Sequence, residues 1–453
     1  MRSAYVHTRA AHRVRLLCSL VALGALTLLS QASLAADTAT LARAVRAGDV
    51  SSARALLQHR ANLNEPLPDG STLLAWAVES QNSELVRLLL DHGAKVNGVG
   101  ELSVAPLFVA CQYGDPAILS ALLDAHADVK ASRPDGLTPF SLCAGSAPGA
   151  ILERMIAAGA TLDHADATGQ TPLMRAAAQG RIENIRLLIT RGAQVNAKSL
   201  NGFTPLFFAL KSHTPEAPMV LLQLGADADY VAPDGTTAVQ LAMYQKDYAF
   251  AAHLIARGAN LSAFDRQGNQ LLHAAVLAGQ PSLVRLLLTK GADANALTGP
   301  STVKMRFEVN FKTGDYDVPP KPPLVLAAES GDAQLMKILV DGGANPQFRM
   351  PDGTNVLLAA AASGKLQALQ LALRLAPDPN TATKAGDTAL HILVSTGTGS
   401  ELAPMMKLLA DSGARTDLKN RAGRTAADLA KEAETDAKLA YDAAFAVQRV
   451  GKL

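Results

Sequence analysis

The chain has 453 residues, of which 49% are hydrophobic, 18% charged and 4% aromatic. Half of the chain is therefore available for a core, which excludes an intrinsically disordered protein. Its three cysteines are too few for a disulfide-dense scaffold, and its formal net charge of +2 is close to neutral.

Residues 1–35 have the three-part layout of a secretory signal. The first 15 residues contain four arginines and no acidic residue. An uncharged run that consists mostly of Leu, Ala and Val follows over residues 16–30. Ser33 and Ala35 then place small residues at the two positions that a signal peptidase reads. An uncleaved anchor is the alternative, but the run is shorter than the roughly 20 residues that cross a bilayer. We expect cleavage near Ala35 and a periplasmic or secreted protein.

Cleavage would change the charge balance of the chain. It leaves 38 basic residues against 40 acidic ones, because four arginines and no acidic residue are lost. A chain this close to neutral lacks the basic stripe of a nucleic-acid binder. No later stretch is apolar enough to span a membrane, so we expect no membrane span after cleavage.

From residue 38 onward the sequence repeats with a period of 33. A box resembling Thr-Pro-Leu opens at Thr72, Ala105, Thr138, Thr171, Thr204, Thr237 and Gln270. A glycine marker keeps the same period at Gly159, Gly192, Gly225, Gly258 and Gly291. Two independent markers in step indicate a stack of structural repeats.

Residues 171–202 show how one repeat is built. Thr171 can cap a helix that starts with proline, and Gly180 can end that helix in the left-handed conformation. A second helix follows with Ile and Leu at helical spacing, and Gly192 closes it. Asn201-Gly202 is a turn signal for a short hairpin, so the unit is helix–turn–helix plus finger.

These elements resemble the ankyrin repeat family, through the Thr-Pro-Leu, Ala-Ala, Leu-Leu and Gly-Ala-x-Val-Asn segments of residues 171–202. The resemblance covers residues 38 to about 435. It implies an all-α repeat protein, an ankyrin solenoid of about twelve helix–turn–helix repeats with short β-hairpin fingers. Within a repeat domain of residues 36–453, we expect residues 38–70 and 425–453 to cap the two ends, because solenoids need polar terminal units.

Residues 298–322 hold a 19-residue insertion where one finger belongs, and we expect one elongated finger there. Apolar and polar residues alternate from Met305 to Lys312, which is the period of a half-buried strand. Thr313-Gly314 is predicted to be the turn, and residues 315–318 the returning strand. This finger either grips a partner or merely covers its own solenoid. The residues assigned to partner binding are Arg306, Phe307, Phe311 and Tyr316.

The groove of an ankyrin stack predicts a second set of partner-binding residues. The family's concave groove is formed by the finger tips and the exposed ends of the first helices. By register, the groove residues are Tyr113, Phe203, Lys211, Tyr244, Gln245, Arg266 and Gln267. Aromatic and Arg side chains are common anchors of protein interfaces, although Phe203 and Tyr244 could instead pack against neighbouring fingers.

Metal and redox chemistry is not favoured by the pattern. His59 and His92 occupy the same position in adjacent repeats, but later repeats place Arg or Lys there, which fits a cation at a helix C-terminus better than a metal ligand. Cys111 and Cys143 are nearly equivalent in neighbouring first helices. We expect two free thiols, because the stacking distance should exceed the reach of about 7 Å between Cα atoms.

Catalysis is not favoured either. The resemblance gives His273 and His391 structural hydrogen bonds. No phosphate loop, zinc-protease helix or nucleophile elbow occurs, so we expect neither an enzyme nor a cofactor.

The sequence therefore indicates an exported bacterial ankyrin-repeat protein that acts as a monomeric, non-catalytic scaffold of the cell envelope. Its partner would be another protein, held in the concave groove. One alternative is a secreted effector that acts on a host protein. A metal-binding or catalytic protein is the other alternative.

Overall fold

The computed structural model describes residues 38–58, 62–67, 70–98, 104–212, 214–300, 305–306, 313–314, 319–433 and 435–450. The predicted signal segment, residues 1–35, lies outside them. The described residues divide into two compact units, one that ends at Asp227 and one that begins at Ala228.

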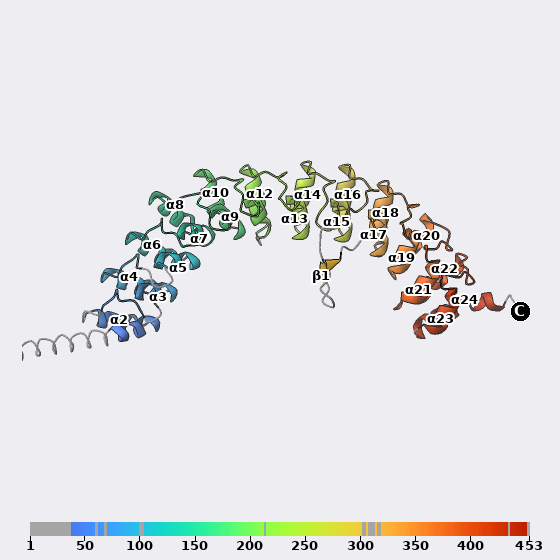
Figure 1. Ribbon diagram of the computed structural model, residues 1–453, viewed down its shortest axis with the longest axis horizontal. Coiled ribbons are helices and arrows are strands. Elements are labelled where there is room, and N and C mark those ends of the chain that lie inside the picture. The colour runs from blue at the N-terminus through green and yellow to red at the C-terminus, as the bar shows by residue number, and fades with distance from the viewer. Residues whose placement is uncertain are drawn as a thin grey trace, which may run out of the picture. The chain divides into compact units, whose positions relative to one another are not determined.

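The first unit consists of helix pairs whose members form two rows (Figure 1). The first row follows a helix over residues 38–46 and contains α3 (Leu73–Glu79), α5 (Pro106–Tyr113), α7 (Pro139–Ser146), α9 (Pro172–Ala178) and α11 (Pro205–Leu210). The second row contains α2 (Val50–Leu57), α4 (Ser83–Asp91), α6 (Pro116–Asp124), α8 (Gly149–Ala157), α10 (Ile182–Thr190) and α12 (Glu216–Gln223). From α2 onward each helix packs on the next one in its own row, and from α3 onward each also packs on its partner in the other row.

The second unit repeats this plan. Its first row contains α13 (Ala238–Tyr244), α15 (Leu271–Leu277), α17 (Pro323–Glu329), α19 (Val356–Ala362), α21 (Ala389–Thr396) and α23 (Ala426–Glu432). Its second row contains α14 (Tyr248–Ala256), α16 (Pro281–Thr289), α18 (Ala333–Asp341), α20 (Leu366–Leu375), α22 (Leu402–Asp411) and α24 (Thr435–Val450). The described residues thus make six helix pairs in each unit, as the 33-residue period predicts.

The predicted helix boundaries rest on local chemistry that the structure shows. Thr72, Thr138, Thr171 and Thr237 each accept a hydrogen bond from the backbone N–H three residues on, which satisfies a free donor of the first turn. Gly180 follows α9 with φ +60°, the left-handed conformation predicted for it. None of the helices in the described part of the chain combines the length and the apolar character that a membrane crossing requires.

Cys111 and Cys143 form a disulfide bond between α5 and α7. The expectation of free thiols was wrong, because the two Cα atoms lie only 4.5 Å apart. Glycine lets the helices approach this closely: a Cβ on Gly114 would lie 2.6 Å from the carbonyl oxygen of Ser146. Ser146 in turn donates its hydroxyl to the carbonyl of Cys111. Small residues at the contact therefore bring equivalent positions within bonding reach.

The insertion forms a two-stranded antiparallel sheet, β1 (Met305–Arg306) with β2 (Thr313–Gly314). Met305 faces Gly314 and Arg306 faces Thr313, so the prediction of a turn at Thr313-Gly314 was wrong. A β-branched threonine suits a paired strand, and the following glycine alone does not make a turn. The other residues of the predicted strands, 307–312 and 315–318, lie outside the described residues.

Hydrogen bonds join the two ends of the insertion, so the helices before and after it stay stacked on each other. The Thr298 N–H donates to the Lys321 carbonyl at 3.1 Å, and the Lys321 N–H donates to the Thr298 hydroxyl at 3.0 Å. Asn295 bridges to the next repeat through the Gly343 carbonyl at 3.0 Å, as Asn196 bridges to Gly225 in the first unit at 3.1 Å. The 19 extra residues therefore interrupt neither row of helices.

Candidate binding groove

Two of the predicted groove residues meet in the first unit. The Lys211 ammonium lies 5.4 Å from the centre of the Phe203 ring, and this ring lies 5.6 Å from that of Phe207. A cation over an aromatic face is attracted by the electron-rich ring. Phe203 is half-buried and packs on α11 and Lys211 of its own repeat. Tyr113 stands apart at the end of α5 and is 53% exposed.

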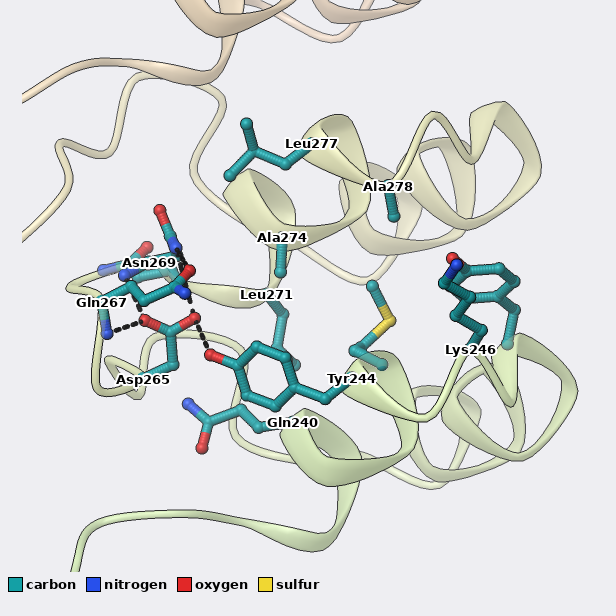
Figure 2. Close-up of a pocket in the computed structure, with 13 residues that line it drawn as sticks. Gln240, Tyr244, Lys246, Asp265, Gln267, Asn269, Leu271, Ala274, Leu277 and Ala278 are labelled. Carbon is teal, nitrogen blue, oxygen red and sulfur yellow. Dashed lines mark hydrogen bonds between the residues drawn. The ribbon is translucent and has the colours of Figure 1, made fainter. Parts of the chain in front are cut away.

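Tyr244 and Gln267 meet in the second unit, where they line a pocket of about 230 Å³ (Figure 2). The pocket lies between the end of α13, the start of α14, the finger before α15, and α15 itself. Its apolar wall is formed by Met243, Tyr244, Tyr248, Leu271, Ala274, Leu277 and Ala278. Its polar rim is formed by Gln240, Lys246, Asp265, Gln267, Asn269 and Gln270. One side chain of a partner could enter this space.

Tyr244 is fixed in the pocket by Asp265, as Figure 2 shows. Its hydroxyl donates to the Asp265 carboxylate at 2.6 Å. That carboxylate also accepts the backbone N–H of Gln267 at 2.8 Å and of Asn269 at 2.7 Å. Burial, the hydrogen bond and the charge of Asp265 raise the pKa of Tyr244 well above its usual range. Tyr244 is therefore a neutral, oriented ring that is still 45% exposed, suited to contact rather than to proton transfer.

The remaining predicted residues lie at the edges or outside. Gln245 follows α13 directly and is exposed. Arg266, on the same finger as Gln267, lies 4.0 Å from Asp234 on the preceding finger. Arg306 belongs to β1. Phe307, Phe311 and Tyr316, the other insertion residues predicted to bind a partner, lie outside the described residues.

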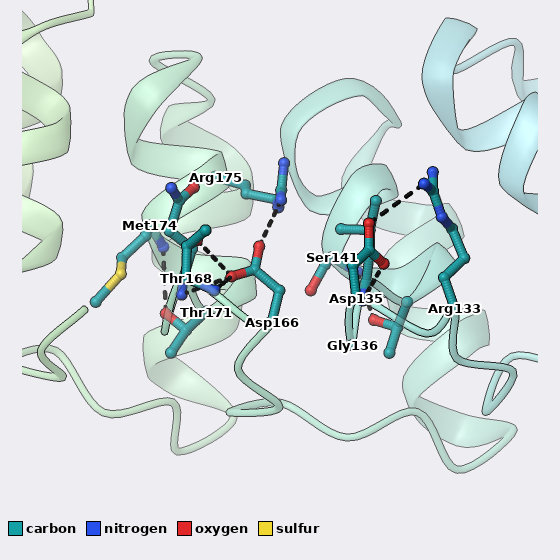
Figure 3. A network of polar contacts seen from close by, with 12 residues as sticks. Arg133, Asp135, Gly136, Ser141, Asp166, Thr168, Thr171, Met174 and Arg175 are labelled. Atoms are coloured by element: carbon teal, nitrogen blue, oxygen red, sulfur yellow. Dashed lines mark hydrogen bonds and ion pairs between the residues drawn. The ribbon is translucent and has the colours of Figure 1, made fainter. Parts of the chain in front are cut away.

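The acidic residues of the fingers hold the turns. Asp166 accepts the backbone N–H and the hydroxyl of Thr168 at 2.8 and 2.6 Å, and the Arg175 guanidinium at 2.7 Å (Figure 3). Burial opposes its ionisation, but these hydrogen bonds outweigh burial and lower the pKa of Asp166. Asp265 accepts backbone N–H groups at the same spacing, two and four residues on. These carboxylates stabilise the turns that carry the groove.

Sequence reasoning missed two contributors to the groove. Leu277 is 55% exposed and lines the Tyr244 pocket. It lies 33 residues after Tyr244, so the period could have found it. Trp76, the chain's single tryptophan, lies on α3 with the Arg46 guanidinium 4.8 Å from its ring centre, beside a hollow of about 410 Å³. The rarity of tryptophan was the available signal.

Three of the histidines considered in the sequence analysis make hydrogen bonds through a ring nitrogen, whereas the buried Nδ1 of His273 has no partner among the described residues. His273 places Nε2 3.0 Å from the Ala296 carbonyl, and His391 places Nε2 3.2 Å from the Arg424 carbonyl, which confirms their structural role. His92 places Nδ1 2.8 Å from the Leu88 carbonyl, and His59 lies outside the described residues. Across the described ranges no three His, Cys, Asp or Glu residues group as metal ligands would.

Stacked helix pairs with fingers are the architecture of a repeat solenoid. A family model described as ankyrin repeats (3 copies) matches residues 16–100, 41–133, 107–199, 140–232, 206–298 and 324–422. The chain belongs to the ankyrin repeat family, which confirms the resemblance. Ankyrin repeat proteins mediate protein–protein interaction, and their repeat domains are typically non-catalytic.

Similar proteins share the repeats rather than the full length. The chain is 30% identical to mouse (Mus musculus) ankyrin repeat and SOCS box protein 16 over 41% of its own length and 45% of the relative's. The human (Homo sapiens) protein of that name is 31% identical over the same shares. The chain therefore spans less than half of these curated relatives. The solved ankyrin repeat domain of human ASB11 is 25% identical, with a TM-score of 0.41, over 44% of this chain and 90% of that one.

Proposed function

We propose that this protein is a non-catalytic scaffold of the bacterial cell envelope, which holds a partner protein in the groove between its first helices and its fingers. The observation that carries the proposal is the Tyr244 pocket. Tyrosine is a common interface anchor, and Tyr244 is already held by its hydrogen bond to Asp265, so it loses little freedom on binding; the exposed Leu277 adds apolar surface beside it.

Two features support export. Residues 1–35 have the layout of a secretory signal. The Cys111–Cys143 disulfide suits an oxidising compartment such as the periplasm, because cytosolic thiols are kept reduced. A scaffold that works outside the cytoplasm would combine both features.

Affinity capture from envelope extracts tests the proposal. The mature chain serves as bait beside a variant that combines Tyr244→Ala and Leu277→Ala. Losing a central anchor typically costs about 2 kcal/mol or more, or roughly 30-fold in affinity, so the double variant should lose the captured partner.

A matched control is Leu439→Ala, which removes a leucine that is 62% exposed on α24, outside the pocket. Equal capture by all three baits would refute binding at this pocket. Fractionation of cells that express the full chain decides the location: recovery from the periplasm supports the scaffold, and recovery from the medium favours an effector.

A further inference from the structure

We infer that a hollow on the first-row helices of the first unit, from α5 to α11, binds the main chain of an extended, uncharged segment of a partner. Three glutamine carboxamides would pair with peptide groups of that segment, and two small residues leave room for its main chain. The inference rests on the proposed function and adds a second part of the groove, with the chemistry of the segment that binds there.

The hollow has a volume of about 440 Å³ and the length of a short extended peptide. Its lining begins at Cys111 and Gln112 on α5, continues over α7 and α9, and ends at Phe208 on α11. Neighbouring packed helices lie about 8 to 10 Å apart, and an extended chain advances about 3.3 Å per residue. The three steps from α5 to α11 therefore match about eight extended residues.

Two small residues create the hollow. Gly145 of α7 and Ala178 of α9 occupy equivalent positions, 33 residues apart. In the other repeats from α3 to α15 the same position holds larger side chains, namely Glu79, Gln112, Lys211, Tyr244 and Leu277. Packing does not demand the glycine, because the nearest atom to a Cβ on Gly145 would be the Cγ of the exposed Gln179, at 3.2 Å. Glycine weakens a helix relative to alanine, so the space above Gly145 is kept at a cost to α7.

Three side-chain carboxamides border the hollow, those of Gln112, Gln170 and Gln179. None of them makes a hydrogen bond to another residue in the part of the chain that the structure describes. A carboxamide carries the same N–H donor and C=O acceptor as a peptide group, so it can pair with a peptide group in both directions. An extended segment leaves its own N–H and C=O groups free for such pairing, and main-chain hydrogen bonds supply affinity in this mode of recognition.

The lining of the hollow carries no net charge. Of the described residues that line it, Arg175 alone is charged, and its Nη2 donates to the Asp166 carboxylate at 2.7 Å (Figure 3). The Asp166 side chain is only 6% exposed and stays ionised, because its hydrogen bonds lower its pKa. The Lys211 ammonium lies over the Phe203 ring, and Lys211 does not line the hollow. The carboxylate and the guanidinium offset each other, so an uncharged segment is favoured over an acidic or a basic one.

The test selects a displayed library of random dodecapeptides on the full-length chain. We expect enrichment of sequences depleted of Asp, Glu, Lys and Arg. One enriched peptide, labelled with fluorescein, is then titrated by fluorescence polarisation beside copies that carry one alanine or one N-methylated residue each. N-methylation removes a main-chain donor, so it should weaken binding about five-fold or more at two or more positions, whereas most alanine copies should bind within about two-fold.

Variants of the hollow separate binding from stability. Gly145→Gln fills the hollow with the side chain that the preceding repeat carries at Gln112, and it should weaken the peptide at least about ten-fold. The melting temperature should not fall, because glutamine favours a helix more than glycine does. Gln179→Ala should weaken the parent peptide about five-fold and have no further effect on one of the N-methylated copies, a coupling that a merely structural Gln179 would not show. The matched control is Gln370→Ala, which removes an exposed glutamine of α20 outside the hollow and should leave every titration unchanged.

The outcomes distinguish this inference from the proposed function. The inference is overturned if no peptide is enriched, if Gly145→Gln leaves the affinity unchanged, or if the peptide tolerates N-methylation at every position. Enriched peptides that lose affinity with Tyr244→Ala but not with Gly145→Gln would leave the proposed function standing without it. Loss with Gly145→Gln, together with unchanged partner capture by the Tyr244→Ala/Leu277→Ala bait, would support the hollow and refute the Tyr244 pocket.

Discussion

The Cys111–Cys143 bond should make a large contribution to the stability of the first unit. The two residues are 32 positions apart, so the bond closes a loop of that size in the unfolded chain. In the chain-entropy account, such a loop removes about 12 cal/mol/K from the unfolded state, or about 4 kcal/mol at 25 °C. Both cysteines are fully buried, so replacing them by alanine also leaves a small void.

The assay is urea unfolding followed by circular dichroism on the chain that starts at residue 36, which contains only these two cysteines. The Cys111→Ala/Cys143→Ala variant should unfold its first unit at a lower urea midpoint. Dithiothreitol should lower the midpoint of the wild type and leave that of the variant unchanged. Two titratable thiols in the unreduced, denatured wild type, together with no effect of dithiothreitol, would refute the reasoning.

The insertion, the glycine after α9 and one buried histidine can each be tested by unfolding experiments. Deleting residues 302–318 should leave the helical circular dichroism and the melting temperature nearly unchanged, because Thr298 and Lys321 close the base; a cooperative loss of helix would show that the insertion is structural. Gly180→Ala should lower the urea midpoint more than Gly192→Ala, because its Cβ would lie 2.0 Å from the Thr214 hydroxyl whereas Gly192 has open space; equal losses would count against this contact. Burial lowers the pKa of His273 in the folded protein below the usual 6.5. Its contribution to stability is therefore present above pH 6.5 and is lost as the pH falls through the pKa of the folded state. The urea midpoint should drop between pH 7.5 and 5, and it should drop less in the His273→Gln variant.

The helices were predictable because their signals are local. Thr171 caps a helix and Gly180 ends it through interactions with neighbours a few residues away, so the 33-residue period predicts their places. The disulfide was not predictable in this way. The distance between α5 and α7 depends on the side chains that meet between them, and Gly114 acts across a sequence distance of about one repeat.

The pocket was predictable only in part for a similar reason. Register gave Tyr244 and Gln267, but the anchor depends on the phenol reaching Asp265, 21 residues further along the chain. In the insertion, alternation predicted paired strands, but it does not fix the register in which Met305 pairs with Gly314.

Site-specific photo-crosslinking tests most directly whether the groove binds a partner. A photoreactive phenylalanine analogue is placed at Leu277 in the full-length chain and, as a control, at Lys337, and cells are irradiated before fractionation. We predict one discrete crosslinked protein from position 277 that is absent from position 337 and is lost when Tyr244→Ala is added. Identical crosslinking patterns from the two positions, or none from position 277, would contradict the account.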